Sequence, residues 1–227
     1  MNSYTLEKEG FSIEYNTLSS SECDQLICIL SNKSDGENTK AGIRNLMSNE
    51  AVAGIANSTR IRRIASRILG NDAVPYRATM FNKSGDVNWL VIWHQDTALP
   101  LANRFQRKGW GPWSKKAGVS YAHAPTEVLS NVVALRIHLD DSTSENGPLR
   151  VIPGSHKLGV LSEDEILKHA KVNNPVECIV PKGSVMAMRP LMIHASSKAS
   201  NHLPRRVLHI EYSGSLEIAS GVRLALA

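Results

Sequence analysis

The sequence predicts a mainly β protein, a double-stranded β-helix (a jelly-roll, cupin-like barrel) with flanking N-terminal helices. Two patterns lead to this prediction. Helix-like spacing of apolar residues dominates the first 73 residues, and from Val74 onward short segments alternate apolar and polar residues with a period of two. A length of 227 residues suits one domain. We therefore expect a single domain with helical support at 1–73 and a barrel at 74–212.

Local signals mark where the helices begin and end. The segments Ser19–Glu22 and Ser162–Glu165 each carry the Ser-x-x-Glu pattern of a capping box, in which side chain and backbone satisfy each other's hydrogen bonds. Residues 49–69 have the periodicity of one or two helices, and Gly70 supplies a stop signal. These signals predict support helices before the barrel and one short helix within it.

Strand patterns follow one another through the second half of the chain. They lie at 74–94, 131–141, 176–180, 184–196 and 205–213. Turns are expected at Ser84–Asp86 and at Lys182–Gly183. Residues 97–128 instead contain three prolines and three glycines, so we expect a long irregular loop. A loop of that length in a compact domain is usually functional, which favours a lid.

Composition excludes several classes of protein. The net charge is +5, which favours anionic small molecules over cationic ones. Three cysteines without paired spacing suggest reduced thiols and a cytoplasmic setting. The first residues lack the charged and apolar regions of a signal peptide, and no apolar run approaches the roughly 20 residues of a membrane span. We expect a protein that does not enter the membrane.

A His-x-acid pattern occurs three times, which makes any single copy weak evidence for a metal site. The pattern matters because two histidines and one carboxylate can hold Fe(II) on one face and leave positions open for oxygen and substrate. A third ligand, a histidine on a distant strand, is then required. The three copies are His94-x-Asp96, His138-x-Asp140 and His209-x-Glu211.

The three copies differ in how many residues follow them, and therefore in whether a distal histidine and the remaining barrel strands can follow. No histidine follows Glu211, so the last copy lacks a distal ligand. His194 follows the other two, but the remaining barrel strands fit tightly after Asp140 and comfortably after Asp96. The first copy is favoured, and a strand residue bonded to a polar neighbour is the preferred interpretation of His138. Alternation would place His94 and Asp96 on the face of two apolar residues expected in the core, Leu90 and Ile92.

A candidate anion anchor follows the distal histidine. Arg205 lies eleven residues after His194, at the start of the last predicted strand. A guanidinium presents a planar fork that matches a carboxylate. Arg206 is adjacent and could serve instead, but strand alternation sends only one of the two side chains into the barrel.

These motifs together resemble the phytanoyl-CoA dioxygenase family of Fe(II)/2-oxoglutarate oxygenases. The resemblance rests on "WHQDT", "IHLDDSTSENGPLRVIPGSHK", "MIHASS" and "PRR", which occur in the family's order and span roughly residues 75–212. It implies that the iron ligands are His94, Asp96 and His194. It further implies that Arg205 binds the 5-carboxylate of 2-oxoglutarate with help from Ser196, and that Thr97 resembles a less regular cosubstrate contact.

The resemblance also implies a reaction. With Fe(II), 2-oxoglutarate and O2, such an enzyme hydroxylates a small organic substrate and releases succinate and CO2. Related halogenases have a small residue where this chain has Asp96, so hydroxylation is expected rather than halogenation. The alternative is a non-catalytic, cupin-like protein that binds a metal or a small acid.

Candidate substrate contacts come from the predicted lid and one strand. Within 97–128, Trp110 and Trp113 stand among basic residues, which favours closure over an acidic or aromatic small molecule. Basic and aromatic residues together can also bind single-stranded nucleic acid, but the stretch is short and the net charge modest, so no nucleic-acid partner is expected. Arg136, on a strand near the predicted pocket, is a further candidate contact.

Overall fold

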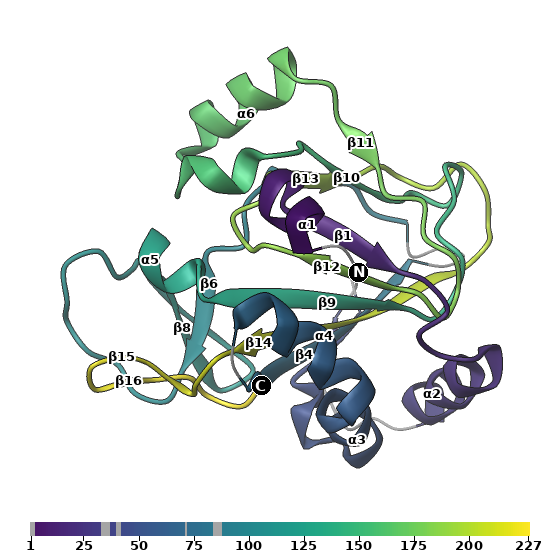
Figure 1. The fold of residues 1–227 in the computed structure, drawn as a ribbon, viewed down its shortest axis with the longest axis horizontal. Helices are drawn as coiled ribbons and strands as arrows, with labels where there is room; N and C mark the ends of the chain where they lie inside the picture. Colours follow the sequence, from purple (N-terminus) through teal and green to yellow (C-terminus); the bar gives the residue numbers. More distant parts are fainter. Residues whose placement is uncertain (1–2, 33–36, 40–41, 71, 84–87) are drawn as a thin grey trace.

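The computed structural model contains two facing antiparallel sheets and describes residues 3–32, 37–39, 42–70, 72–83 and 88–227 (Figure 1). The large sheet has the order β1 (Phe11–Glu14), β12 (Val185–Met188), β9 (Val132–His138), β14 (Arg205–Ser213), β4 (Val74–Lys83), β3 (Gly42–Arg44) and β2 (Glu37–Thr39). The small sheet has the order β11 (Val176–Glu177), β10 (Leu149–Val151), β13 (His194–Ser196) and β5 (Val91–His94). This arrangement confirms the predicted jelly-roll class.

Helices cover the outer face of the large sheet. Figure 1 shows α2 (Ser20–Asn32), α3 (Glu50–Asn57) and α4 (Thr59–Leu69) on one side of the sheet and α6 (Glu163–Val172) on the other side, beyond the small sheet. Helix α1 (Ser3–Glu9) leads into β1, and the 3-10 turns η1 (Leu46–Ser48) and η2 (Ser155–Leu158) are short connections. The outer core joins the helices to alternate strand residues, including Leu26, Val52, Ile61, Leu135, Ile137, Leu208 and Ile210.

The predicted helix boundaries are present. The Ser19 backbone N–H donates to Glu22 Oε2 at 2.7 Å and the Glu22 backbone N–H donates to Ser19 Oγ at 3.2 Å, which is the reciprocal capping box. Ser162 and Glu165 form the same box at the start of α6. Gly70 ends α4 with φ of 74°, a left-handed conformation that glycine adopts without steric cost.

The inner face of the large sheet is unusually polar. Because side chains alternate along a strand, the residues between the apolar ones point into the space between the two sheets. On β9 and β14 the pairing partners Arg136 and His209 lie side by side on this face, and Glu211 follows two residues later. All three are buried, so the barrel interior encloses charged groups rather than a purely apolar core.

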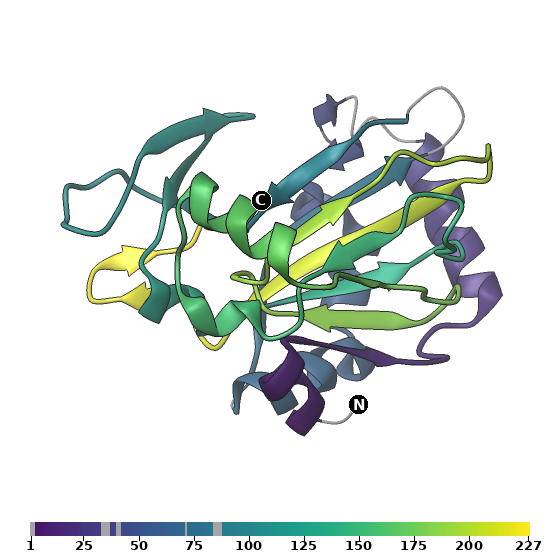
Figure 2. The same cartoon turned by 90° about the horizontal axis from the view of Figure 1, so that it is seen from above.

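The expectation of an irregular loop at 97–128 is wrong. This region contains a three-stranded antiparallel sheet, β6 (Ala98–Leu101), β8 (Val119–His123) and β7 (Trp113–Lys116), followed by α5 (Thr126–Leu129). Figures 1 and 2 show it at one end of the large sheet beside the hairpin β15 (Glu217–Ala219) and β16 (Val222–Arg223). The tight turn between β7 and β8 uses Ala117 and Gly118 at φ of 48° and 79°. Alanine is rare in that conformation, which explains why the sequence did not signal a hairpin.

The strand that carries His94 also differs from expectation. Leu90 and Ile92 are exposed, Ile92 by 71%, and do not enter the core. The register between β5 and β13 shifts, because His94 pairs with His194 while Val91 pairs with Ser196. This bulge breaks the simple alternation. The predicted turn at 84–86 lies outside the described residues, and the first 73 residues contribute β1, β2 and β3 in addition to helices.

In the part of the chain that the structure describes, we find no helix with the length and apolar character needed to cross a bilayer.

Candidate metal and cosubstrate site

The structure brings His94, Asp96 and His194 together between the two sheets. One ligand atom from each lies within 4.8 Å of the others. His94 ends β5 and His194 begins β13, and since the two residues pair across these strands, their rings lie 4.2 Å apart. The Asp96 backbone N–H donates to the Pro190 carbonyl at 3.0 Å, which holds the carboxylate beside the two imidazoles.

Hydrogen bonds orient both imidazoles for metal binding. Nδ1 of His94 lies 2.8 Å from the Ile92 carbonyl, and Nδ1 of His194 lies 2.8 Å from the Met192 carbonyl. A carbonyl only accepts, so each Nδ1 carries the proton and each Nε2 offers a lone pair. These Nε2 atoms lie 3.8 Å and 3.5 Å from the Asp96 oxygens.

The protonation states suit a metal cation. Burial lowers the pKa of His194 to about 4, so its imidazole is neutral at neutral pH. Burial opposes the charge of Asp96, but His194 and His94 hold the pKa of its carboxyl below the usual range. Two imidazoles and one carboxylate are the donor set of the two-His-one-carboxylate Fe(II) site.

The other two His-x-acid pairs have different surroundings. Both ring nitrogens of His138 are buried without a hydrogen-bond partner among the described residues, so the expected bond from His138 to a polar neighbour is wrong. The carboxylate of Asp140 is bound by Arg206. Nε2 of His209 donates to Glu211 at 3.3 Å. Within the described ranges, the cluster around Asp96 is the one group of three such side chains close enough together to hold an ion.

A cavity of about 100 Å³ opens onto this cluster. It is lined by Phe81, Trp89, Val91, His94, Asp96, Arg136, Leu149, His194, Ser196 and Arg205. Arg205 is only 4% exposed, and its Nε donates to the Asn146 carbonyl at 3.3 Å. Burial and the neighbouring Arg136 lower the pKa of Arg205. The cavity therefore places two buried guanidinium groups beside the candidate metal ligands.

Lys83 is a third buried cation, which contacts Ser196 of the cavity wall without lining the cavity itself, and sequence reasoning missed it. The residue is 1% exposed, and its Nζ donates to Ser196 Oγ at 2.9 Å and to the Ser197 carbonyl at 2.6 Å. Burial and Arg205 lower its pKa to about 8. A lysine at a strand end is ordinarily solvated, so its position gave no signal. No carboxylate among the described residues pairs with Lys83 or Arg205, which is the arrangement expected of a site that receives an anion.

Arg205 and Arg206 point in opposite directions, as strand alternation requires. Arg206 donates from Nε and Nη2 to the Asp140 carboxylate at 2.7 Å and 2.8 Å, a two-pronged ion pair away from the cavity. Arg205 lines the cavity with Ser196. Their assignment to a cosubstrate stays a prediction, with the geometry favouring Arg205.

The remaining predicted site residues lie elsewhere. The Thr97 hydroxyl lies 2.6 Å from Nδ1 of His123 and does not line the cavity. Trp110 and Trp113 each pack edge-on against Phe105, with ring centroids 5.2 Å apart. They belong to the apolar cluster at the three-stranded sheet. The proposed lid and the two tryptophan contacts remain predictions, and the structure gives both rings a packing role.

Glu211 is the centre of a buried polar network that the sequence did not reveal. Its carboxylate accepts from the Tyr76 hydroxyl at 2.8 Å, from Arg77 Nη1 at 3.0 Å and from His209 Nε2. Nδ1 of His209 in turn accepts from Arg136 Nη1 at 3.1 Å. A second, very small cavity is lined by both Glu211 and Asp96, together with Ala98, Leu99, Val132, Ala134, Pro190 and His209. The network therefore adjoins the candidate metal cluster.

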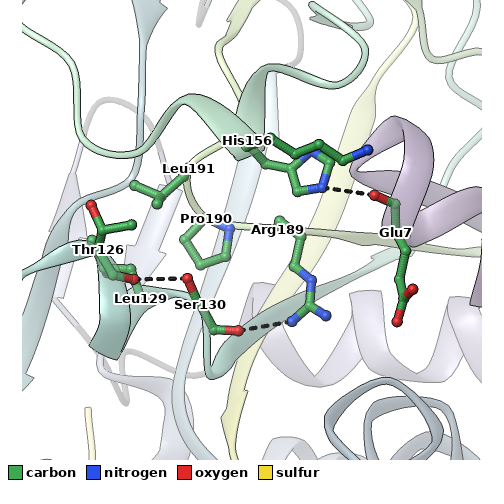
Figure 3. A pocket seen from close by; sticks show the side chains of 9 residues that line it. Glu7, Thr126, Leu129, Ser130, His156, Arg189, Pro190 and Leu191 are labelled. Atoms are coloured by element: carbon green, nitrogen blue, oxygen red, sulfur yellow. Dashed lines mark hydrogen bonds between the residues drawn. The ribbon is translucent and has the colours of Figure 1, made fainter.

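A larger cavity, of about 310 Å³, is lined by Glu7, Thr126, Leu129, Ser130, His156, Lys157, Arg189, Pro190 and Leu191 (Figure 3). None of the candidate ligands lines it. Two of its polar side chains are bonded to backbone carbonyls: Arg189 donates to the Ser130 carbonyl at 3.1 Å, and His156 Nε2 donates to the Glu7 carbonyl at 3.2 Å. Size alone therefore does not identify the functional site, and the side-chain chemistry favours the smaller cavity.

Comparison with known proteins agrees with this geometry. The model of the phytanoyl-CoA dioxygenase (PhyH) family matches residues 32–207, well over half of the chain. An L-proline trans-4-hydroxylase of Streptomyces griseoviridis is 27% identical over 176 residues, which are 66% of this chain and 58% of that enzyme. This chain thus matches less than two thirds of the relative's length.

Two solved structures share the fold. EctD from S. alaskensis, in its apo form, has a TM-score of 0.70 at 19% identity, covering 93% of this chain and 75% of EctD. AviO1 from Streptomyces viridochromogenes Tue57 has a TM-score of 0.66 at 21% identity, covering 93% and 92%. At these identities the comparison speaks to fold alone. Together with the family match, it shows that the chain belongs to the phytanoyl-CoA dioxygenase family of Fe(II)/2-oxoglutarate-dependent oxygenases.

Proposed function

We propose that the protein is a hydroxylase that oxidises a small organic molecule with Fe(II), 2-oxoglutarate and O2, and releases succinate and CO2. One observation carries the proposal: the His94, Asp96 and His194 cluster faces a cavity whose buried cations have no carboxylate partner among the described residues. A dianion such as 2-oxoglutarate supplies the missing charge. Solved relatives support the pairing, since EctD has been solved with 2-oxoglutarate and 5-hydroxyectoine, and HygX with nickel and 2-oxoglutarate.

Each polar residue then has a task. His94, Asp96 and His194 would hold Fe(II) through two nitrogens and one oxygen, which leaves positions for ligands. Arg205 and Ser196 would bind the far carboxylate of 2-oxoglutarate, and we add Lys83 to them because its ammonium already touches Ser196. When bound, the iron and 2-oxoglutarate supply the oxidising chemistry.

Apolar and aromatic side chains line part of the cavity. Phe81, Trp89, Val91 and Leu149 line it together with the charged residues, and the Arg136 guanidinium carbon lies 5.5 Å from the centre of the Phe81 ring. Hydrogen bonds from guanidinium and ammonium groups to a carboxylate strengthen when water is excluded. The cavity can therefore bind a carboxylate in a fixed orientation while its other end faces the metal ligands.

The substrate is proposed to be a small anionic molecule. The relative named for L-proline hydroxylation acts on a small compound that carries a carboxylate, and the chain has a net positive charge. We also propose a cytoplasmic setting, because the cysteines are odd in number and without paired spacing. A non-catalytic protein that binds a metal or a small acid remains the alternative.

Succinate formation separates the two functions. The Fe(II)-loaded protein, given 2-oxoglutarate and O2, is expected to form succinate, and faster with a substrate than without. The control is His194→Ala, which lacks one candidate ligand. Succinate no higher than in this control, across a panel of small acids that includes L-proline, would favour the non-catalytic alternative.

The pH dependence of 2-oxoglutarate binding tests the role of Lys83. Its pKa of about 8 means that the ammonium is present below pH 8 and is lost above it. A bound dianion stabilises the charged form, so affinity should be nearly constant from pH 6.5 to 7.5 and fall by up to about tenfold per pH unit above 8. Calorimetric titration of the Mn(II) protein under anaerobic conditions measures this. Lys83→Gln should bind more weakly at pH 7 and show no such fall, whereas an equal fall in that variant would assign the titration to another group.

A further inference from the structure

Two cations lie against one aromatic ring beyond the cosubstrate cavity. The Arg77 guanidinium carbon is 5.3 Å from the centre of the Tyr121 ring, and Lys116 Nζ is also 5.3 Å from it. Arg77 belongs to β4, while Lys116 and Tyr121 belong to the β7–β8 hairpin. The ring therefore joins the large sheet to the three-stranded sheet, with a positive charge from each.

These cations adjoin the metal cluster through a chain of contacts. Arg77 is bonded to Glu211, and Glu211 shares the very small cavity with Asp96. Burial would lower the pKa of Arg77, but Glu211, Tyr121 and Asp96 raise it above its ordinary value. Arg77 therefore lies at the end of the barrel where Asp96 and Glu211 line one small cavity, and Lys116 lies against the same Tyr121 ring as Arg77.

Lys116 has no anionic partner among the residues described. Partial burial, Arg44 and Arg77 lower its pKa, so it stands in a positive environment. The hairpin that carries it is held in place, because the Asn45 side chain donates to the Ala117 carbonyl at 3.4 Å. The ammonium is thus kept near other cations although like charges repel, and a bound anion would relieve that repulsion.

The charged residues of the barrel interior also indicate a site for an anion. The inner residues comprise four cations, Lys83, Arg77, Arg136 and Arg205, and two carboxylates, Asp96 and Glu211. Binding Fe(II) together with doubly charged 2-oxoglutarate leaves that excess unchanged, because their charges cancel. Positive charge therefore remains in the interior after the metal and cosubstrate are accounted for, and the exposed Lys116 lies against the same Tyr121 ring as Arg77, one of these cations. Buried excess charge is costly unless a ligand compensates it.

We propose that Arg77 and Lys116 form a carboxylate clamp against the Tyr121 ring, and that this clamp selects small carboxylic acids as substrates. The inference rests on the proposed function, since it assigns the substrate of the same site. Glu211 fixes the Arg77 guanidinium through Nη1, which orients the fork before the substrate arrives. Lys116, exposed on the hairpin, supplies the second charge. The clamp assigns substrate recognition to residues other than Trp110, Trp113 and Arg136.

The test compares acids with their amides near the metal. Mn(II) protein with 2-oxoglutarate, kept anaerobic, is titrated with L-proline, benzoate, phenylacetate and the corresponding amides. Paramagnetic relaxation of the ligand protons reports binding close to Mn(II) without requiring turnover. For at least one acid, the ligand protons are expected to relax faster in the presence of the Mn(II) protein, and the protons of its amide are not. Lys116→Gln should weaken that acid's binding by about tenfold or more, the size typical of a hydrogen bond to a charged group.

Two further variants make the result specific. Lys115→Gln is the matched control, because Lys115 is the exposed neighbour on the same strand and should leave binding unchanged. Arg77→Lys keeps the charge beside Glu211 but loses the fork, and it should also weaken the acid. Three results would each overturn the clamp. They are amides that bind as well as the acids, no enhanced proton relaxation for any acid, and unchanged acid binding by Lys116→Gln. If the proposed function itself is wrong, 2-oxoglutarate fails to bind the Mn(II) protein in calorimetry; the clamp can fail while that binding is intact.

Discussion

His94→Ala and Asp96→Ala are each expected to abolish stoichiometric binding of Fe(II) or Mn(II). The ligand atoms of these residues and His194 lie within 4.8 Å of one another, and each substitution removes one of only three protein donors. A divalent ion that is held by only two protein donors dissociates readily, because water molecules bind such ions well and replace the protein ligands. Equilibrium dialysis with Mn(II), followed by metal analysis, measures the stoichiometry, which should fall from one to near zero.

The matched control is His138→Ala. His138 belongs to the second His-x-acid pair, but both of its ring nitrogens are buried without a hydrogen-bond partner in the part of the chain that the structure describes, and burial lowers its pKa well below the ordinary value. Its removal should leave the metal stoichiometry at one. If His138→Ala loses the metal and His94→Ala retains it, the metal site must be assigned to the second pair.

Loss of metal must be distinguished from loss of fold. The Asp96 side chain is 41% exposed and borders open cavities, so Asp96→Ala removes little packing. Thermal unfolding of the metal-free variant should therefore match that of the metal-free wild type. In the presence of Mn(II), only the wild type should gain stability, because a ligand that binds the native state alone raises its unfolding temperature.

Local sequence signals predicted the features that depend on neighbours in the chain. The capping boxes at Ser19 and Ser162 and the stop at Gly70 lie where expected, because each involves residues within four positions. The opposite directions of Arg205 and Arg206 followed from strand alternation in the same way. His94, Asp96 and His194 lie in one cluster, which agrees with the order of the family's motifs. Periodicity alone could not have predicted that the strands of His94 and His194 pair.

Features set by distant residues could not be predicted. The Glu211 network joins Tyr76 and Arg77 to residues more than 130 positions away, and nothing in the local pattern around any of them indicates it. Lys83 is buried because strands β4 and β13 meet, not because of its neighbours in sequence. The β5 bulge likewise arises from pairing with β13, so alternation misplaced Ile92.

Arg205→Ala is expected to weaken 2-oxoglutarate binding by about thirty-fold to a few thousand-fold, while Arg206→Ala changes it by at most about five-fold. Removing one partner of a buried, hydrogen-bonded charge pair costs about 2–5 kcal/mol, and about 1.4 kcal/mol is a factor of ten. Arg205 is 4% exposed and lines the cavity. Arg206 points away from it, and a partly exposed charge contributes about 0–1 kcal/mol.

The variant that keeps 2-oxoglutarate binding, Arg206→Ala, should be the less stable of the two. Arg206→Ala breaks the two-pronged pair with Asp140 and leaves that carboxylate, 14% exposed, without its partner, so its unfolding temperature should fall. Arg205→Ala removes a cation that repels Arg136 and Lys83, so the ligand-free protein should lose little stability. Binding and stability thus report on different arginines, and a thermal scan without 2-oxoglutarate separates them.

Calorimetric titration of 2-oxoglutarate into the anaerobic Mn(II) protein decides between the arginines. Metal stoichiometry should stay at one in both variants, because neither side chain contacts the candidate ligands' Nε2 or carboxylate oxygens. A near-normal titration for Arg205→Ala with a collapsed one for Arg206→Ala would transfer the anchor to Arg206. Two normal titrations would mean that the buried cations do not receive the cosubstrate. Arg205→Lys sharpens the result: it keeps the charge but not the planar fork, so an intermediate affinity indicates that geometry as well as charge holds the carboxylate.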